Sequence, residues 1–187
     1  MTGRGWLGAP RAADAAERIL AAAAELFAER GVAATGMADI AKAAGCSRAT
    51  LYRYFDSRQA VRLAFVNREA RRIGAGVLRE IDGVTAPADR VVAGILASLR
   101  AVRADPLLIA WFRPGDAGFA GEIAETSEVI EAIAGSLFDA DHHDMSLRAR
   151  WLTRIIVSLL TVPGRDEDDE REMLERFVAP LVTETRI

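Results

Sequence analysis

A run of hydroxyl, phenol and guanidinium side chains stands in the stretch SRATLYRYFDSR, residues 47–58. Arginine donates hydrogen bonds in a planar fork that suits phosphate oxygens and guanine, and hydroxyl groups also donate to phosphate. A short helix that exposes these groups therefore predicts a DNA-binding surface. The alternative is that the two tyrosines pack internally and the arginines are merely solvated.

Two short amphipathic segments position these side chains. The first covers about residues 37–44, and the second follows Ser47, a residue type that favours the start of a helix. The turn between them contains Gly45, and this pattern is typical of a helix-turn-helix. Ile40 and Leu51 are expected to form the apolar contact between the two helices.

The rest of the chain also predicts helices. Alanine is frequent and no run of alternating β-branched residues occurs, so the sequence predicts an all-α fold of about nine helices. Glycine, proline and acidic clusters mark the breaks between them. Helices are expected over residues 14–30, 37–44, 48–54, 57–81, 88–104, 106–112, 122–138, 146–161 and 168–185.

Composition limits the class of protein. The 187 residues carry a net charge of −3, with a mildly basic balance in residues 1–58 and an acidic one in the remainder. No apolar run reaches the roughly 20 residues that cross a membrane, and the start of the chain does not resemble a signal peptide. The single cysteine forms no internal disulfide. These features predict a globular cytoplasmic protein.

The sequence resembles the TetR family of transcriptional regulators. The resemblance is carried by ERILAAAAELFAERGVAAT at residues 17–35 and MADIAKAAGCSRATLYRYFDSRQAV at residues 37–61, and it extends over about residues 14–66. It implies a flexible arm over residues 1–13, a three-helix DNA-binding head over residues 14–57, and a helical effector-binding and dimerisation domain over residues 58–187.

The resemblance also implies roles for particular residues in the head. Arg48 and Ala49 would meet base edges, and the other members of the set would hold phosphates or extend the exposed face. Gly36 and Ala38 replace longer side chains of the family, so specificity should rest mainly on the second helix of the motif. The implied DNA-binding residues are Thr35, Arg48, Ala49, Thr50, Tyr52, Arg53, Tyr54 and Arg58.

Large apolar residues gather beside the glycine and proline breaks in the middle of the chain. Such residues either pack closely or line a cavity for a ligand. The resemblance to the family implies a mostly apolar small-molecule effector that shifts the separation of two heads. The candidate effector-binding residues are Leu96, Leu99, Leu108, Trp111, Phe112 and Phe119.

One short helix reads only a few base pairs, so useful specificity calls for two heads on a pseudo-palindromic operator. Apolar stripes in the last two predicted helices provide a candidate homodimer surface. The alternative is that these stripes face their own core. The candidate interface residues are Leu147, Trp151, Ile155, Leu159, Leu174, Phe177 and Leu181.

The resulting hypothesis is a ligand-responsive regulator that binds double-stranded DNA, with repression as the commoner behaviour in the family. The alternative is a helical-bundle enzyme or small-molecule carrier in which the head is only structural. The sequence contains no nucleophile elbow, P-loop or paired-carboxylate signature, so neither an enzyme nor a cofactor is expected.

Three other patterns favour simpler interpretations. GRGWLG at residues 3–8 matches a dinucleotide-binding spacing, but no strand precedes it. His142 and His143 lack a further well-spaced ligand, so a polar loop is expected and not a metal site. The acidic run at residues 166–170 is expected to be a solvated first helical turn, favoured by the helix dipole.

Overall fold

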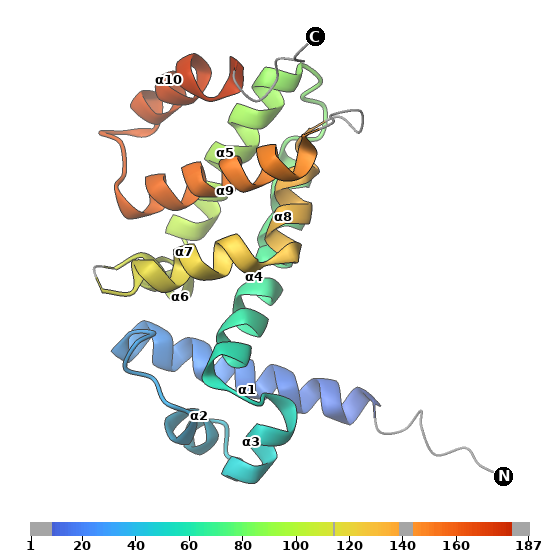
Figure 1. The fold of residues 1–187 in the computed structure, drawn as a ribbon, viewed down its shortest axis with the longest axis vertical. Coiled ribbons are helices and arrows are strands. Elements are labelled where there is room, and N and C mark those ends of the chain that lie inside the picture. Colours follow the sequence, from blue (N-terminus) through green and yellow to red (C-terminus); the bar gives the residue numbers. More distant parts are fainter. Residues whose placement is uncertain (1–8, 114, 139–143, 181–187) are drawn as a thin grey trace, which may run out of the picture. The chain divides into compact units, whose positions relative to one another are not determined.

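The computed structural model describes residues 9–113, 115–138 and 144–180. Over these residues it consists of ten α-helices and one short 3₁₀ helix, without a strand (Figure 1). The all-α fold class predicted from the sequence is confirmed. The chain divides into two compact units, Met1–Phe65 and Val66–Ile187. None of the helices in the described residues is long and apolar enough to cross a membrane.

The first unit is built from three helices and the start of a fourth. Buried apolar side chains hold it together: the rings of Phe27 and Phe65 meet edge to face with centroids 5.9 Å apart, and Ile40 and Leu51 are fully buried. Both residues predicted to form the contact between the two short helices are therefore buried, and α2 packs on α3. The bounds are α1 Ala9–Arg30, α2 Met37–Ala43, α3 Arg48–Tyr54 and α4 Arg58–Glu80.

Gly31 and Gly45 end α1 and α2 with backbone φ angles of 90° and 65°. Only glycine adopts this left-handed conformation without strain, so these residues terminate the helices and let the chain turn sharply. The Gly31 N–H donates to the Phe27 carbonyl at 3.0 Å, and the Cys46 N–H donates to the Ala41 carbonyl at 3.0 Å. The conformation of the turn between α2 and α3 is thus set by the backbone angle of Gly45 and by a backbone hydrogen bond.

The second unit is a helical bundle. Within it α9 packs on α5, α7 and α8, and α10 packs on α5. Ile95, Leu99, Leu152 and Leu174 are among the buried side chains of its core. The bounds are α5 Pro87–Arg103, α6 Pro106–Ile109, η1 Ala110–Phe112, α7 Ala117–Thr126, α8 Glu128–Gly135, α9 Met145–Thr161 and α10 Glu167–Phe177.

Several predicted helix bounds need correction. Residues 9–13, expected to belong to the arm, are part of α1; Pro10 lies in the first turn of that helix, where proline is tolerated. Residues 1–8 of the expected arm lie outside the described residues. The single helix expected over residues 122–138 is two helices that meet at Ser127. The last helix was expected to reach residue 185; α10 ends at Phe177, and residues 181–185 lie outside the described residues.

Ser127 explains the break between α7 and α8. Its hydroxyl oxygen accepts a hydrogen bond from the Ile130 N–H at 3.2 Å, which caps α8. The same hydroxyl donates to Asn67 Oδ1 in α4 at 2.6 Å, and Ser127 is buried. One side chain therefore starts a helix and ties it to another.

The acidic run at the start of α10 is only partly solvated, which corrects the sequence prediction. Asp166 caps the helix, but Glu170 is 1% exposed. Its carboxylate accepts hydrogen bonds from the Arg103 guanidinium of α5 at 2.7 and 2.8 Å and from the Gly164 N–H at 2.9 Å. Arg103 also donates to the Leu159 carbonyl of α9, so this ion pair joins three helices.

Candidate nucleic-acid interface

Helix α3 begins at a well-formed cap. The Ser47 hydroxyl accepts from the Thr50 N–H at 3.0 Å and lies 2.9 Å from the Thr50 hydroxyl. Leu51 points inward and is fully buried, which fixes the rotation of the helix about its axis. The remaining surface of the helix forms an open face, with Tyr52 44% exposed and Arg48, Ala49 and Arg53 also exposed.

The chemistry of this open face suits a polyanion. Arg48 offers a planar set of donors, Tyr52 offers a hydroxyl, and Ala49 between them is small enough to allow close approach. The Arg53 guanidinium lies over the Tyr54 ring, 5.4 Å from its centroid, while the ring itself is half-buried. Tyr54 is thus both a packing residue and a support for a neighbouring cation.

Thr35 is placed differently from the sequence prediction. It is 0% exposed, and its hydroxyl donates to the Gly31 carbonyl at 2.8 Å, with the Leu26 carbonyl at 3.3 Å. A hydroxyl committed to two buried carbonyls has no surface for a phosphate. The prediction of a phosphate contact at Thr35 is therefore wrong, and the residue instead shapes the turn between α1 and α2.

Two arginines of α4 hold the same turn. Arg58 Nη1 donates to the Ala33 carbonyl at 3.2 Å, and the buried Arg62 Nη2 donates to the Val32 carbonyl at 2.6 Å. Arg58 is exposed and keeps further donors for a phosphate. Sequence reasoning missed Arg62, although its spacing of four residues from Arg58 placed both on one side of the helix.

Lys42 is a further basic residue that the sequence prediction omitted. It is exposed in the last turn of α2. Arg18 of α1 donates to the Ala44 carbonyl at 3.3 Å, which holds the end of α2 in place. Lys42 is the only lysine of the chain. It lies six residues before the start of α3 and adds positive charge to the helix-turn-helix.

Comparison with known proteins identifies the motif. A family model described as bacterial regulatory proteins, tetR family, matches residues 19–65. An uncharacterized HTH-type transcriptional regulator of Mycobacterium tuberculosis is 50% identical over 187 residues, which covers 98% of this chain and 93% of that protein. The chain belongs to the TetR family of bacterial regulatory proteins. The helix-turn-helix and the family predicted from the sequence are confirmed.

Solved TetR-family structures have the same fold. The TetR family repressor AlkX from Dietzia sp. strain DQ12-45-1b, implicated in biodegradation of n-alkanes, is 26% identical, with a TM-score of 0.64 over 89% of this chain and 94% of that chain. The TetR family repressor FadR of Thermus thermophilus, solved in complex with lauroyl-CoA, is 24% identical, with a TM-score of 0.58 over 92% and 96%.

The predicted effector residues of this TetR-family chain form part of a packed interior. Leu96, Leu99, Leu108 and Trp111 are buried, and Leu96 and Leu99 belong to the main core of the second unit. Phe112 and Phe119 are half-buried. These placements agree with close packing as well as with a ligand site, so the effector role stays a prediction.

The predicted dimer residues differ in how far they are exposed. Leu147 and Trp151 are 59% and 47% exposed, and Phe177 is exposed. Ile155 and Leu159 are partly buried against the core, whereas Leu174 is 1% exposed and lies within it. Leu174 has no surface to offer a partner, which corrects that assignment. Leu181 lies outside the described residues, as do His142 and His143.

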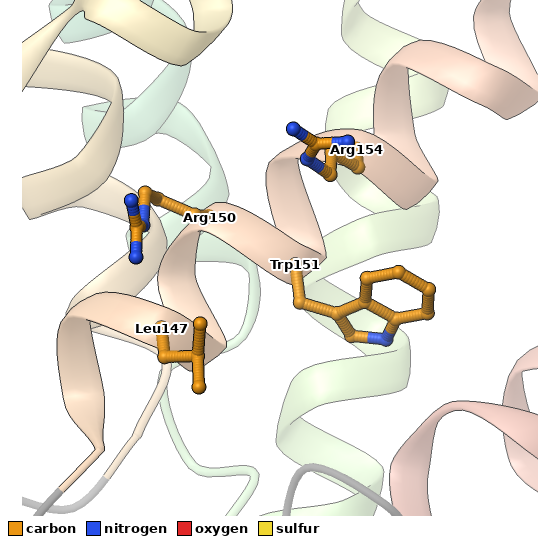
Figure 2. A pocket seen from close by; sticks show the side chains of 4 residues that line it. All are labelled: Leu147, Arg150, Trp151 and Arg154. Atoms are coloured by element: carbon orange, nitrogen blue, oxygen red, sulfur yellow. The ribbon is translucent and has the colours of Figure 1, made fainter.

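A surface hollow lies on α9 where Leu147, Arg150, Trp151 and Arg154 line it, and we call it the α9 hollow. Its volume is about 450 Å³. Figure 2 shows the two guanidinium groups along one edge and the Leu147 and Trp151 side chains along the other. The α9 hollow is therefore apolar on one side and cationic on the other.

Proposed function

We propose that this TetR-family protein is a ligand-responsive transcriptional regulator that binds a pseudo-palindromic DNA operator as a homodimer. The observation that supports it is the outer face of α3, where Arg48, Ala49, Tyr52 and Arg53 are exposed over a fully buried Leu51. A short helix of seven residues is about as long as the major groove is wide. We place this action in the cytoplasm.

Within this proposal some residues of α3 recognise bases and others bind phosphates. Arg48, in the first turn, would donate two hydrogen bonds to a guanine, and the Ala49 methyl would meet a thymine methyl. Thr50, Tyr52 and Tyr54 would donate to phosphates, together with Arg58 at the start of α4. Phosphate contacts position the head, and Arg48 supplies the sequence preference.

The second unit, in this proposal, binds a mostly apolar effector near Trp111 and Phe112. The buried apolar residues of α5, α6 and η1 support an apolar ligand, and the relative solved with lauroyl-CoA suggests an acyl chain as the first probe. Binding would change the separation of two heads, which must match successive major grooves about 34–36 Å apart. The protein without effector would repress transcription, in line with AlkX and FadR, which are both described as repressors.

A gel-shift titration tests the DNA-binding part. The wild-type chain should bind a preferred duplex with an affinity that falls steeply as salt rises, because phosphate contacts release counterions. Arg48→Ala should lose about 1–3 kcal/mol on the preferred sequence and much less on a mixed sequence. An equal loss of affinity on both duplexes would mean that Arg48 does not recognise a base.

The effector part is tested with lauroyl-CoA as the probe. If it binds near η1, Trp111 fluorescence should change and the duplex should be released. The Trp111→Phe variant should keep DNA binding but lose the fluorescence change assigned to residue 111. Unchanged operator release by Trp111→Ala would count against an effector site at this residue.

A further inference from the structure

Side chains hold the backbone between α1 and α2, over residues 31–36, which we call the α1–α2 turn. Three consecutive carbonyls at its start each accept a hydrogen bond from a side chain. The pairs are Thr35 Oγ1 to Gly31 at 2.8 Å, Arg62 Nη2 to Val32 at 2.6 Å and Arg58 Nη1 to Ala33 at 3.2 Å. The two arginines belong to α4 and follow their acceptors by 30 and 25 residues. The α1–α2 turn is therefore tied to a helix that comes much later in the chain.

Arg62 stands on a part of α4 that packing already fixes. It is only 3% exposed, and Val61 and Phe65 on the same helix are buried apolar residues. The Phe65 ring meets the Phe27 ring of α1 edge to face, with centroids 5.9 Å apart. The start of α4 is thus part of the core of the head, and the Arg62 guanidinium reaches the turn from a fixed backbone.

The hydrogen bond between Arg62 and Val32 matters because both partners are buried. Arginine stays protonated in proteins, and a buried charge is unfavourable unless the protein supplies its hydrogen bonds. Val32 is 0% exposed, so its carbonyl also needs a partner within the protein. A methionine at position 62 could fill similar space, but it would take away the guanidinium donor of this buried carbonyl.

The α1–α2 turn in its turn sets the position of α2. Gly36, the last residue of the turn, is the N-cap of α2: its carbonyl accepts from the Ile40 N–H at 3.1 Å, and its N–H donates to Asp39 Oδ2 at 3.2 Å. α2 packs on α3, and Ile40 and Leu51 are fully buried. A displacement of the turn would therefore move α2 and, with it, the open face of α3.

We propose that Arg62 is a positioning residue that holds the α1–α2 turn and thereby fixes the orientation of α3 toward DNA. The inference rests on the proposed DNA binding and adds a residue that acts on it through the fold. A guanidinium that is 3% exposed presents no donors to a phosphate outside the protein. Arg58 is exposed, so it combines its bond to the turn with donors for a phosphate. Removal of the two arginines should therefore change DNA binding in different ways.

The first test compares two duplexes, one preferred sequence selected from a random pool and one mixed sequence. Arg62→Met should lower the affinity for the preferred duplex about 10-fold, because a base contact worth 1.4 kcal/mol depends on the orientation of α3. The affinity for the mixed-sequence duplex should fall much less, because phosphate contacts carry no sequence information. Gel-shift titrations measure both. An unchanged ratio of the two affinities would overturn the inference.

The salt dependence of binding separates Arg62 from Arg58. Arg62→Met should leave the salt slope on the mixed-sequence duplex unchanged, because the buried guanidinium releases no counterion from DNA. Arg58→Met should lower the slope by about 0.9, the value of one phosphate contact. A lowered slope in Arg62→Met would mean that Arg62 binds phosphate itself, which would contradict a positioning role.

Val61→Ala is the control for a loss of stability alone. Val61 is buried beside Arg62, so its truncation should destabilise the head through lost packing and leave the sequence preference intact while the head is folded. In hydrogen exchange, Arg62→Met should speed the amides of residues 31–40 before those of the rest of the head, whereas Val61→Ala should speed the most protected amides of the head together. If both variants change exchange and preference alike, Arg62 contributes only stability and the inference is wrong.

Arg62→Lys keeps a charged donor, but a single one in place of a planar fork, so it should show a sequence preference between those of wild type and Arg62→Met. If Arg62→Met does not fold, the lysine variant carries the test: a preference equal to that of wild type would overturn the inference. A wild-type chain that binds no duplex would overturn the proposed DNA binding together with this inference. A wild-type chain that binds, with the same preference in Arg62→Met, would overturn the inference alone.

Discussion

Tyr52 and Arg48 lie on the same open face of α3, but they test different parts of DNA recognition. A guanidinium distinguishes bases because its two donors match guanine, whereas a single phenol hydroxyl meets a phosphate that every sequence presents. Tyr52→Phe keeps the ring and removes only the hydroxyl. The Tyr52→Phe variant therefore tests a phosphate contact separately from base recognition.

We expect Tyr52→Phe to weaken binding by about 0.5–1.5 kcal/mol, the net contribution of one hydrogen bond. The loss should be the same on a preferred and a mixed-sequence duplex, and gel-shift titrations on both measure it. A loss confined to the preferred duplex would mean that the hydroxyl reads a base. Full affinity on both would mean that the Tyr52 hydroxyl makes no net contribution to DNA binding.

Glu170 is the residue whose protonation should matter for stability. The Arg103 guanidinium holds the pKa of this carboxyl below its ordinary value of 4.5, against the effect of burial, and the Gly164 N–H lowers the pKa further. A carboxyl with a depressed pKa in the folded state contributes stability above its ordinary pKa, and this stability is lost as pH falls through the folded value.

We therefore expect Glu170→Gln to be less stable than wild type at pH 7, with the difference shrinking as pH falls below about 4.5. Arg103→Met leaves a buried carboxylate unpaired and should destabilise by about 3 kcal/mol, the lower end for buried pairs, because the guanidinium is partly exposed. Denaturant unfolding at several pH values measures both. A stability difference between wild type and Glu170→Gln that does not change with pH would contradict the role of this ion pair.

At the scale of helices, the sequence predicted α3 and its partners better than it predicted the faces of α9. Leu147, Trp151, Ile155 and Leu159 repeat every four residues, but a helix turns about 3.6 residues at a time, so each step drifts by about 40°. The first two side chains therefore face outward, and the last two turn toward the core. A four-residue repeat does not define one face over three steps.

Other features needed tertiary information. The break at Ser127 was not predicted because the residues around it suit a helix. The Ser127 hydroxyl caps α8, and its hydrogen bond to Asn67 of α4 adds a tertiary contact at the same position. Thr35 has the residue type of a phosphate contact, but its burial depends on α1 and the turn it closes. By contrast, Gly31, Gly45 and Ser47 were predictable because their roles are local.

The packing of α4 against α8 gives a prediction with a matched control. A Cβ added at Gly74 would lie 2.8 Å from Ile133 Cγ2, whereas one added at Gly76 would meet nothing within 4 Å. Gly74→Ala should therefore destabilise by about 1–3 kcal/mol through overpacking. Gly76→Ala should stabilise by about 0.5–1 kcal/mol, since alanine favours a helix interior. Denaturant unfolding compares them, and a stabilising Gly74→Ala would mean that the helices separate easily.

At the scale of the whole molecule, the charge distribution favours DNA binding by the head, because residues 1–58 have a mildly basic balance and the remainder has an acidic one. The net charge is −3, so the chain as a whole repels DNA, while the open face of α3 is cationic. Affinity should therefore depend on the head being presented twice to neighbouring grooves, which raises the number of phosphate contacts. A dimer reading two half-sites gains specificity that a single short helix lacks.

Unbiased selection of bound duplexes from a random pool tests whether the chain reads DNA with two α3 helices. The wild-type chain should recover an inverted repeat whose half-sites are about one helical turn, or a multiple of it, apart. Arg48→Ala should recover repeats with a relaxed base at one position of each half-site. Recovery of no enriched sequence, at low as well as moderate salt, would contradict DNA recognition by this motif.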